Sequence, residues 1–143
     1  MTGFLLDTNV ISELTKPRPE PRVTSWIRQT AEELLYLSVL TLGEIRKGII
    51  KVAEPAKRVS LESWLDREVV LRFAGRILPI DHRIADRWGQ ISGRAVLQKR
   101  PISVIDSLLA ATAVEHNLTL VTRNTNDVAG HGAEIFNPWS DPP

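Results

Sequence analysis

The chain has 143 residues, no cysteine and a formal net charge of +1. This length predicts a single compact domain over residues 1–143, and the absence of cysteine excludes disulfides, thiolate metal sites and cysteine nucleophiles. No stretch is long and apolar enough to cross a bilayer, and the first residues lack the pattern of a signal peptide. We therefore expect a cytoplasmic protein without membrane association, and the near-neutral charge leaves room only for a local basic patch that binds nucleic acid.

Short apolar runs alternate with amphipathic segments along the chain. The expected order is strand 3–6, helix 9–14, helix 23–29, strand 34–40, helix 41–52, helix 56–73, strand 76–80, helix 82–96, helix 103–117, strand 118–122 and strand 133–136, with three prolines excluding a helix over 16–22. This alternation predicts an α/β domain with a mainly parallel central sheet of four to five strands flanked by helices. Ligand sites in such sheets lie beyond the carboxyl ends of the strands.

Three acidic residues stand where an expected helix begins, and each has a local explanation. Asp7 can cap the first helix. Thr41 and Glu44 have the spacing of a capping box. Asp106 suits the first turn of a helix capped by Ser103, where the helix dipole favours a negative charge. Taken singly, none of these acids requires a functional role.

Taken together, Asp7, Glu44 and Asp106 indicate a metal site. Strand ends and the starts of the following helices share one edge of a parallel sheet, so the three carboxylates are expected to converge there. Converging carboxylates repel one another, and their pKa values rise unless a cation neutralises them. Ligands that are all oxygen favour Mg²⁺, with Mn²⁺ as a substitute. A water held by such an ion can be activated to attack a phosphodiester.

The loop after strand 118–122 brings more polar side chains to the same edge. Thr122, Asn124 and Asp127 all carry oxygen, and either Asn124 or Asp127 is a candidate for a fourth ligand, directly or through water. An Asx turn is the alternative explanation for this loop. Arg123 lies beside the expected site and is a candidate for binding RNA phosphate.

Five segments carry a family resemblance. In chain order they are LLDTNVISEL, LSVLTLGEIRKGI, FAGRILPID, SVIDSLLAATAVEHNLTLVTRN and IFNPW. As an ordered set covering nearly the whole chain, they resemble PIN-domain proteins, specifically the VapC/FitB-like branch of type II toxins. The resemblance implies a Mg²⁺-dependent endoribonuclease, a hydrolase held inactive by an antitoxin from the same operon, with Asp7, Glu44 and Asp106 as its acidic triad. Many relatives have a fourth acid where this chain has Asn124.

Physical roles follow for the residues at this site. Asp7 and Asp106 are expected to bind the metal directly, and Glu44 to bind it through water or to take a proton from the attacking water. Thr8 and Asn9 are candidates for orienting the Asp7 carboxylate or contacting phosphate, although helix capping explains them equally well. The expected hydrolysis leaves a 5′-phosphate.

Other charged and aromatic residues have weaker claims. Asp81 also follows a strand, and we interpret it as a helix cap. Basic residues on two helices are candidates for phosphate binding, with solubility as the alternative for each; they are Arg46, Lys47, Lys51, Arg83, Arg87 and Arg94. Large apolar residues are expected either in the core or in a groove for a partner helix; they are Trp26, Ile27, Trp64 and Trp88.

The resemblance also implies partners. It favours a cognate antitoxin, an RNA substrate, contact with operator DNA only through the antitoxin, and a homodimer or a heterotetramer or octamer with antitoxin. The alternative function is a catalytically weak PIN-fold binding module that represses transcription together with its antitoxin, which Asn124 in place of an acid favours. A receiver-type phosphotransfer domain ranks below both, because the first strand ends in the single acid Asp7 where that class has a pair.

Overall fold

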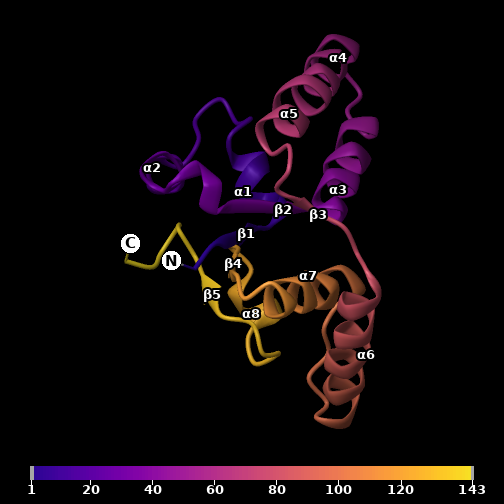
Figure 1. The fold of residues 1–143 in the computed structure, drawn as a ribbon. Coiled ribbons are helices and arrows are strands. Elements are labelled where there is room, and N and C mark those ends of the chain that lie inside the picture. Colours follow the sequence, from indigo (N-terminus) through magenta and orange to yellow (C-terminus); the bar gives the residue numbers. More distant parts are fainter. Residues whose placement is uncertain (1, 143) are drawn as a thin grey trace.

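The computed structural model describes residues 2–142 and contains a five-stranded, all-parallel sheet between two layers of helices (Figure 1). The strands are β1 (Phe4–Leu6), β2 (Leu35–Ser38), β3 (Ile77–Leu78), β4 (Thr119–Val121) and β5 (Ile135–Phe136). The helices are α1 (Thr8–Glu13), α2 (Pro21–Gln29), α3 (Val39–Ile50), α4 (Pro55–Ser63), α5 (Val70–Arg72), α6 (His82–Leu97), α7 (Val104–Glu115) and α8 (Thr125–Val128), with a 3₁₀ turn η1 (Glu32–Leu34) and a π-helical segment η2 (Trp64–Val69). The predicted α/β class with a parallel sheet is confirmed.

The strand order β3-β2-β1-β4-β5 places β1 at the centre of the sheet. Phe4 is in register with Leu35 of β2 on one side and with Thr119 of β4 on the other. All strands run the same way, so their carboxyl ends lie at one edge. The residues that follow β1 and β4 are therefore neighbours, although more than a hundred positions separate them in the sequence.

The side chains of β1 alternate between the two faces of the sheet. Leu6 joins a core formed with α1, α2, α3 and η2, whereas Leu5 joins a core formed with α7 and α8. This period of two is what a strand buried on both faces requires. Both leucines are fully buried, so the backbone that ends in Asp7 is held from both sides.

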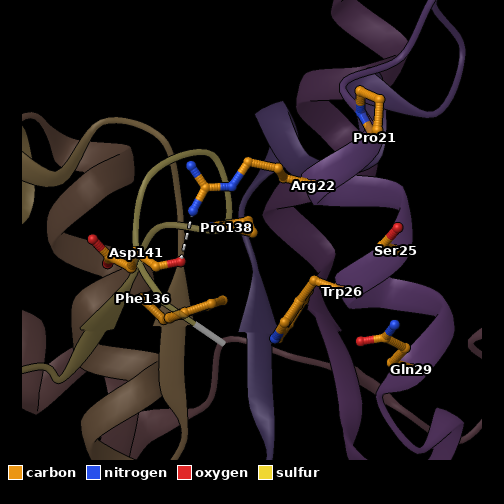
Figure 2. A pocket seen from close by; sticks show the side chains of 8 residues that line it. All are labelled: Pro21, Arg22, Ser25, Trp26, Gln29, Phe136, Pro138 and Asp141. Carbon is orange, nitrogen blue, oxygen red and sulfur yellow. Dashed lines mark hydrogen bonds between the residues drawn. The ribbon is translucent and has the colours of Figure 1, made fainter.

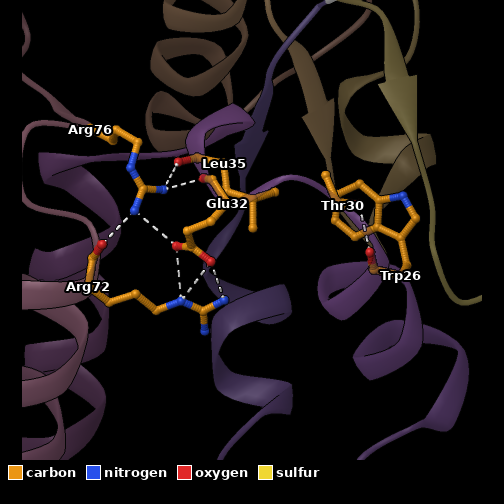
Figure 3. A network of polar contacts seen from close by, with 6 residues as sticks. All are labelled: Trp26, Thr30, Glu32, Leu35, Arg72 and Arg76. Carbon is orange, nitrogen blue, oxygen red and sulfur yellow. Dashed lines mark hydrogen bonds and ion pairs between the residues drawn. The ribbon is translucent and has the colours of Figure 1, made fainter.

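A charged network fastens the opposite, amino-terminal edge of the sheet (Figure 3). Glu32 accepts hydrogen bonds from both Arg72 and Arg76, with ion-pair distances of 2.9 Å to each. Arg76 also donates to the backbone oxygens of Glu32 and Leu35, directly before and at the start of β2. The network thus joins the residues just before β2 to those just before β3. It lies at the end of the sheet opposite the carboxyl edge.

Several boundaries differ from the sequence-based expectation. The segment expected as one helix over 56–73 is α4, η2 and α5, because a π-helical stretch interrupts the α-helical hydrogen bonding at Trp64. Helix α2 begins at Pro21, inside the segment where prolines were expected to exclude a helix, because proline is well tolerated at the first helical position. Helix α7 ends at Glu115 with His116 as its C-cap, so the expected cap Asn117 follows one residue later, with φ of 52°.

Within residues 2–142, no helix combines the length and apolar character needed to cross a membrane.

Candidate active site

Asp7 lies at the centre of the carboxyl edge and is 6% exposed. It caps α1: its Oδ1 accepts a hydrogen bond from the Thr8 backbone N–H at 2.7 Å. Its Oδ2 accepts from the Thr122 hydroxyl at 2.8 Å and from the Asn9 side-chain amide at 3.4 Å. The backbone N–H of Asp7 donates to the Val121 carbonyl at 2.9 Å, which ties the end of β1 to the end of β4. Both carboxylate oxygens are therefore held in fixed directions.

The electrostatic environment of Asp7 includes the other two predicted acids. Burial raises the pKa of Asp7 above its ordinary value, and the hydrogen bonds from Thr122 and Thr8 oppose that rise. The negative charges of Asp106 and Glu44 raise this pKa further. Asp106 and Glu44 thus act on the charge of Asp7, and the binding of one ion by the three acids stays a prediction.

Glu44 is brought to this edge by an earlier helix start than the sequence predicted. Ser38 is the N-cap of α3 and accepts from the Leu40 N–H, so Glu44 lies in the second turn. The predicted capping box of Thr41 and Glu44 is wrong: Thr41 is buried, and within the described residues its hydroxyl has no hydrogen-bond partner. Glu44 instead accepts a hydrogen bond from the Thr8 hydroxyl at 2.7 Å. Thr8 therefore links the carboxylate of α3 to the start of α1, beside Asp7.

Asp106 occupies the predicted place in the first turn of α7. Ser103 is the N-cap and accepts the Asp106 backbone N–H at 3.1 Å. Helix α7 is fixed by burial of its small residues against α6 and the sheet. The local explanation of Asp106 as a favourable charge in the first turn is thus correct, and it is compatible with a place at the site.

The loop after β4 contributes Thr122 more directly than its other polar residues. Thr122 is fully buried, and its hydroxyl donates to Asp7 while accepting the Asn124 backbone N–H at 3.1 Å and the Asn9 amide at 3.3 Å. Asn124 and Asp127 are exposed; Asn124 precedes the short helix α8, and Asp127 lies in it. Thr122 is therefore the residue of this loop that orients the central carboxylate.

The donor chemistry fits a partly hydrated divalent cation. Within the described part of the chain, no group of three or more acidic or histidine side chains is close enough to enclose a metal ion. Mg²⁺ is usually held by one or two carboxylates and keeps several of its waters. Asp7 matches that mode, since it is desolvated, like-charged neighbours face it, and a cation would relieve both effects. Among the acids, Asp7 and Asp106 remain the predicted direct ligands.

Three of the basic residues proposed for RNA binding already form ion pairs. Arg83 and Arg87 both form ion pairs with Glu115, at 3.4 and 2.8 Å. Arg46 pairs with Asp66 across the α3–η2 contact. These ion pairs explain the positions of three arginines structurally. Arg123 adjoins the acids through its backbone N–H, which donates to Asn9 Oδ1.

The large apolar residues divide between core and surface. Ile27 is buried, and Trp26 packs against Phe4 and Phe136 with ring centroids 5.1 and 5.2 Å away. Trp64 lines a pocket of about 140 Å³ between α1, α3 and the α4–η2 segment. Thr8 and Glu44 line the same pocket, so an apolar recess opens directly beside the candidate site.

Known proteins are similar to this chain in sequence and in fold. The sequence matches the PIN domain over residues 4–129. It is 39% identical over 138 residues to Toxin FitB of Neisseria gonorrhoeae, covering 96% of this chain and 99% of that protein. It is 37% identical over 136 residues to VapC ribonuclease Y4jK of Sinorhizobium fredii, covering 95% of this chain and 97% of that protein.

Solved structures agree with the sequence matches. The crystal structure of FitAcB from Neisseria gonorrhoeae superposes with a TM-score of 0.91 at 39% identity, covering 95% of this chain and 98% of that one. The structure of FitAB bound to an IR36 DNA fragment gives a TM-score of 0.92 at 37% identity, covering 97% of both chains.

Proposed function

The chain belongs to the PIN-domain family, and from this premise we propose that it is the toxin of a toxin–antitoxin system and acts as a Mg²⁺-dependent endoribonuclease. The observation that supports this most directly is the buried Asp7 carboxylate, whose pKa is raised by burial and then by Asp106 and Glu44. A buried acid facing two others is unfavourable for folding alone, and it is useful where a cation and a phosphodiester have to meet.

Each side chain of the site has a separate proposed role in hydrolysis. Asp7 and Asp106 would hold Mg²⁺, which would supply positive charge against the phosphate and lower the pKa of a water. Thr122 and Thr8 keep the Asp7 and Glu44 carboxylates in fixed orientations through hydrogen bonds of 2.8 and 2.7 Å. Glu44 is the proposed acceptor of the proton from the attacking water. The water oxygen bonds to phosphorus as the P–O3′ bond breaks, and the departing O3′ takes a proton from solvent, leaving a 3′-hydroxyl and a 5′-phosphate.

The proposed partner is a cognate antitoxin, with operator DNA contacted only through it. Toxin FitB and its solved complexes are the support for this assignment. The recess lined by Thr8, Glu44 and Trp64 offers apolar contacts directly beside the acids. An antitoxin segment seated there, with a basic group on the carboxylates, would block the site. We place the protein in the cytoplasm, where RNA and operator DNA are found, as a dimer that assembles with antitoxin.

A cleavage assay with a matched acid control tests the proposal. The chain, purified free of partner, is incubated with a mixed RNA pool and Mg²⁺, with and without chelator, beside Asp7→Asn and Asp81→Asn. Asp81 also caps a helix after a strand, accepting the Ile84 N–H at 2.9 Å, but it lies outside the site. We expect cleavage that the chelator and Asp7→Asn abolish and that Asp81→Asn preserves.

A second candidate is a catalytically weak binding module that represses transcription with its antitoxin. The residue that favours it is Asn124, which is exposed and neutral where the family resemblance implies an acid. In the same assay, an absence of cleavage by clean wild-type protein on every RNA would favour this module. Cleavage that persists in chelator would contradict the metal-dependent mechanism.

A further inference from the structure

Residues 137–141 follow β5 at the carboxyl edge of the sheet and form a compact turn, called the hook below. Hydrogen bonds from side chains within the segment stabilise it. Asn137 is 9% exposed; its Oδ1 accepts the Trp139 N–H at 2.8 Å, and its N–H donates to Asp141 Oδ2 at 2.8 Å. Figure 2 shows that Arg22 of α2 reaches the Asp141 backbone oxygen, a bond of 3.3 Å. The hook is thus stabilised by its own hydrogen bonds and by a hydrogen bond to α2, a helix near the N-terminus.

The hook presents the Trp139 ring to Arg123. The guanidinium carbon of Arg123 lies 5.3 Å from the ring centroid, a distance typical of a cation–π contact. Trp139 is half-buried and packs against the larger hydrophobic core, so the ring is a rigid support. An exposed arginine that would otherwise sample many rotamers is therefore held in one direction.

Arg123 also adjoins the candidate site through its backbone. Its N–H donates to Asn9 Oδ1 at 3.4 Å, and the Asn9 amide contacts the Asp7 carboxylate. Among residues 2–142, Arg123 has no carboxylate within ion-pair distance. Glu13 lies near enough for Arg123 to lower its pKa slightly, but Glu13 is hydrogen-bonded to Lys16, which lowers that pKa most, and their ion pair measures 2.8 Å. The guanidinium charge therefore remains available to an external anion.

We propose that Trp139 is a positioning residue that holds the Arg123 guanidinium to bind an RNA phosphate next to the one being cleaved. The proposal rests on the proposed ribonuclease function. A guanidinium binds phosphate through two parallel hydrogen bonds, which require a defined orientation. Because the contact lies away from the reacting atoms, it stabilises substrate and transition state equally and acts mainly on KM. The hook thereby connects the C-terminal segment to substrate binding.

The experiment compares four variants with wild type: Trp139→Leu, Trp139→Phe, Arg123→Gln and the double variant of Trp139→Leu with Arg123→Gln. Cleavage of a fluorescent single-stranded RNA gives kcat and KM, and anisotropy in chelator gives the Kd for the same RNA. We expect Trp139→Leu to raise KM and Kd about fivefold with kcat within about twofold, and Trp139→Phe to restore both. The double variant is expected to be no worse than Arg123→Gln alone, because the ring acts through the guanidinium. Arg28→Gln, the loss of an exposed arginine on α2, controls for net charge.

The outcomes separate this inference from the proposed function. If wild type cleaves RNA but Trp139→Leu changes only kcat or thermal stability, or adds fully to Arg123→Gln, the positioning role is overturned and the ribonuclease proposal stands. If wild type binds RNA without cleaving it, a fivefold weaker Kd in Trp139→Leu supports the positioning role while the ribonuclease proposal fails. If wild type neither binds nor cleaves RNA, both are overturned.

Discussion

Replacing Asp7 with asparagine should stabilise the protein while it abolishes activity. Asparagine caps a helix as well as aspartate does, so the bond from the Thr8 N–H survives. An amide nitrogen in place of Oδ2 faces the Thr122 hydroxyl, which already accepts two hydrogen bonds, and the Asn9 amide, so the bonds to Oδ2 are lost and their loss offsets part of the gain. The change removes a desolvated charge and its repulsion by Asp106 and Glu44. Without divalent cations at pH 8, we expect a gain of about 1 kcal/mol in the free energy of unfolding. For a chain of this size, that gain raises Tm by about 3 °C.

The pH dependence gives the expected gain a distinctive form. The folded-state pKa of Asp7 is raised above its ordinary value of 3.8, so the folded protein holds this proton more tightly than the unfolded chain does. Wild type therefore loses stability relative to Asp7→Asn as the pH rises from about 4 through the raised pKa. Below pH 4 the aspartic acid is neutral in both states, and the two proteins are expected to differ little.

Mg²⁺ should remove the difference in the free energy of unfolding between wild type and Asp7→Asn at pH 8. A ligand that binds only the folded state at ten times its Kd adds about 1.4 kcal/mol, and this gain is expected for wild type and not for Asp7→Asn. Urea unfolding at pH 4 and pH 8, with Mg²⁺ or chelator, measures all four conditions, and Asp81→Asn, at the N-cap of α6, serves as the control. An Asp7→Asn protein less stable than wild type at pH 8 in chelator, or a difference that does not change with pH, would refute the electrostatic argument.

Three further substitutions test separate parts of the structure. Thr8→Val removes the hydroxyl bonded to Glu44 and should lower kcat about tenfold, with Thr8→Ser restoring it; unchanged kinetics in Thr8→Val would contradict the orienting role. Glu32→Gln should lower the free energy of unfolding by about 1 kcal/mol at pH 7 with no effect on cleavage; because Arg72 and then Arg76 lower the Glu32 pKa below 4.5, this difference should shrink as the pH falls below 4. Gly3→Ala should cost about 2 kcal/mol in urea unfolding, since a Cβ would lie 2.9 Å from a leucine side chain and 3.0 Å from a backbone oxygen, whereas Gly89→Ala, in open space on α6, should be neutral or stabilising.

The sequence predicted the parts of the site that depend on local order. Asp7 and Asp106 follow directly from where a strand ends or a helix begins, and both lie where that logic placed them. The parallel sheet then brings them to one edge without further information. Strand and helix alternation was sufficient for this because each β-strand of the chain is short and mainly apolar.

Glu44 shows where local rules become ambiguous. The sequence allows two starts for this helix. One has Ser38 as the N-cap, and the other has Thr41 as the N-cap with Glu44 completing a capping box. The structure uses Ser38, which places Thr41 in the interior and turns Glu44 toward Thr8. Packing of α3 on the sheet decides between the two, and a local pattern does not contain that information.

Contacts between distant residues were beyond prediction. Glu115 pairs with two arginines about thirty positions earlier, which gives both arginines a structural role apart from RNA binding. Trp139 meets Arg123 only because β5 lies beside β4 and the hook turns back over that edge. Neither pairing has a periodic signature in the sequence, so both arise from topology.

The outer strands of the sheet have a consequence for how this molecule associates. β3 and β5, the edge strands, pair over only two residues each. An extended segment of another chain therefore has few free backbone groups with which to add a strand to the sheet. Strand-to-strand polymerisation is disfavoured from both sides. Any stable complex, with a second copy or with another protein, is therefore expected to form through helix surfaces and their side chains, and so to depend on shape and sequence rather than on generic backbone pairing.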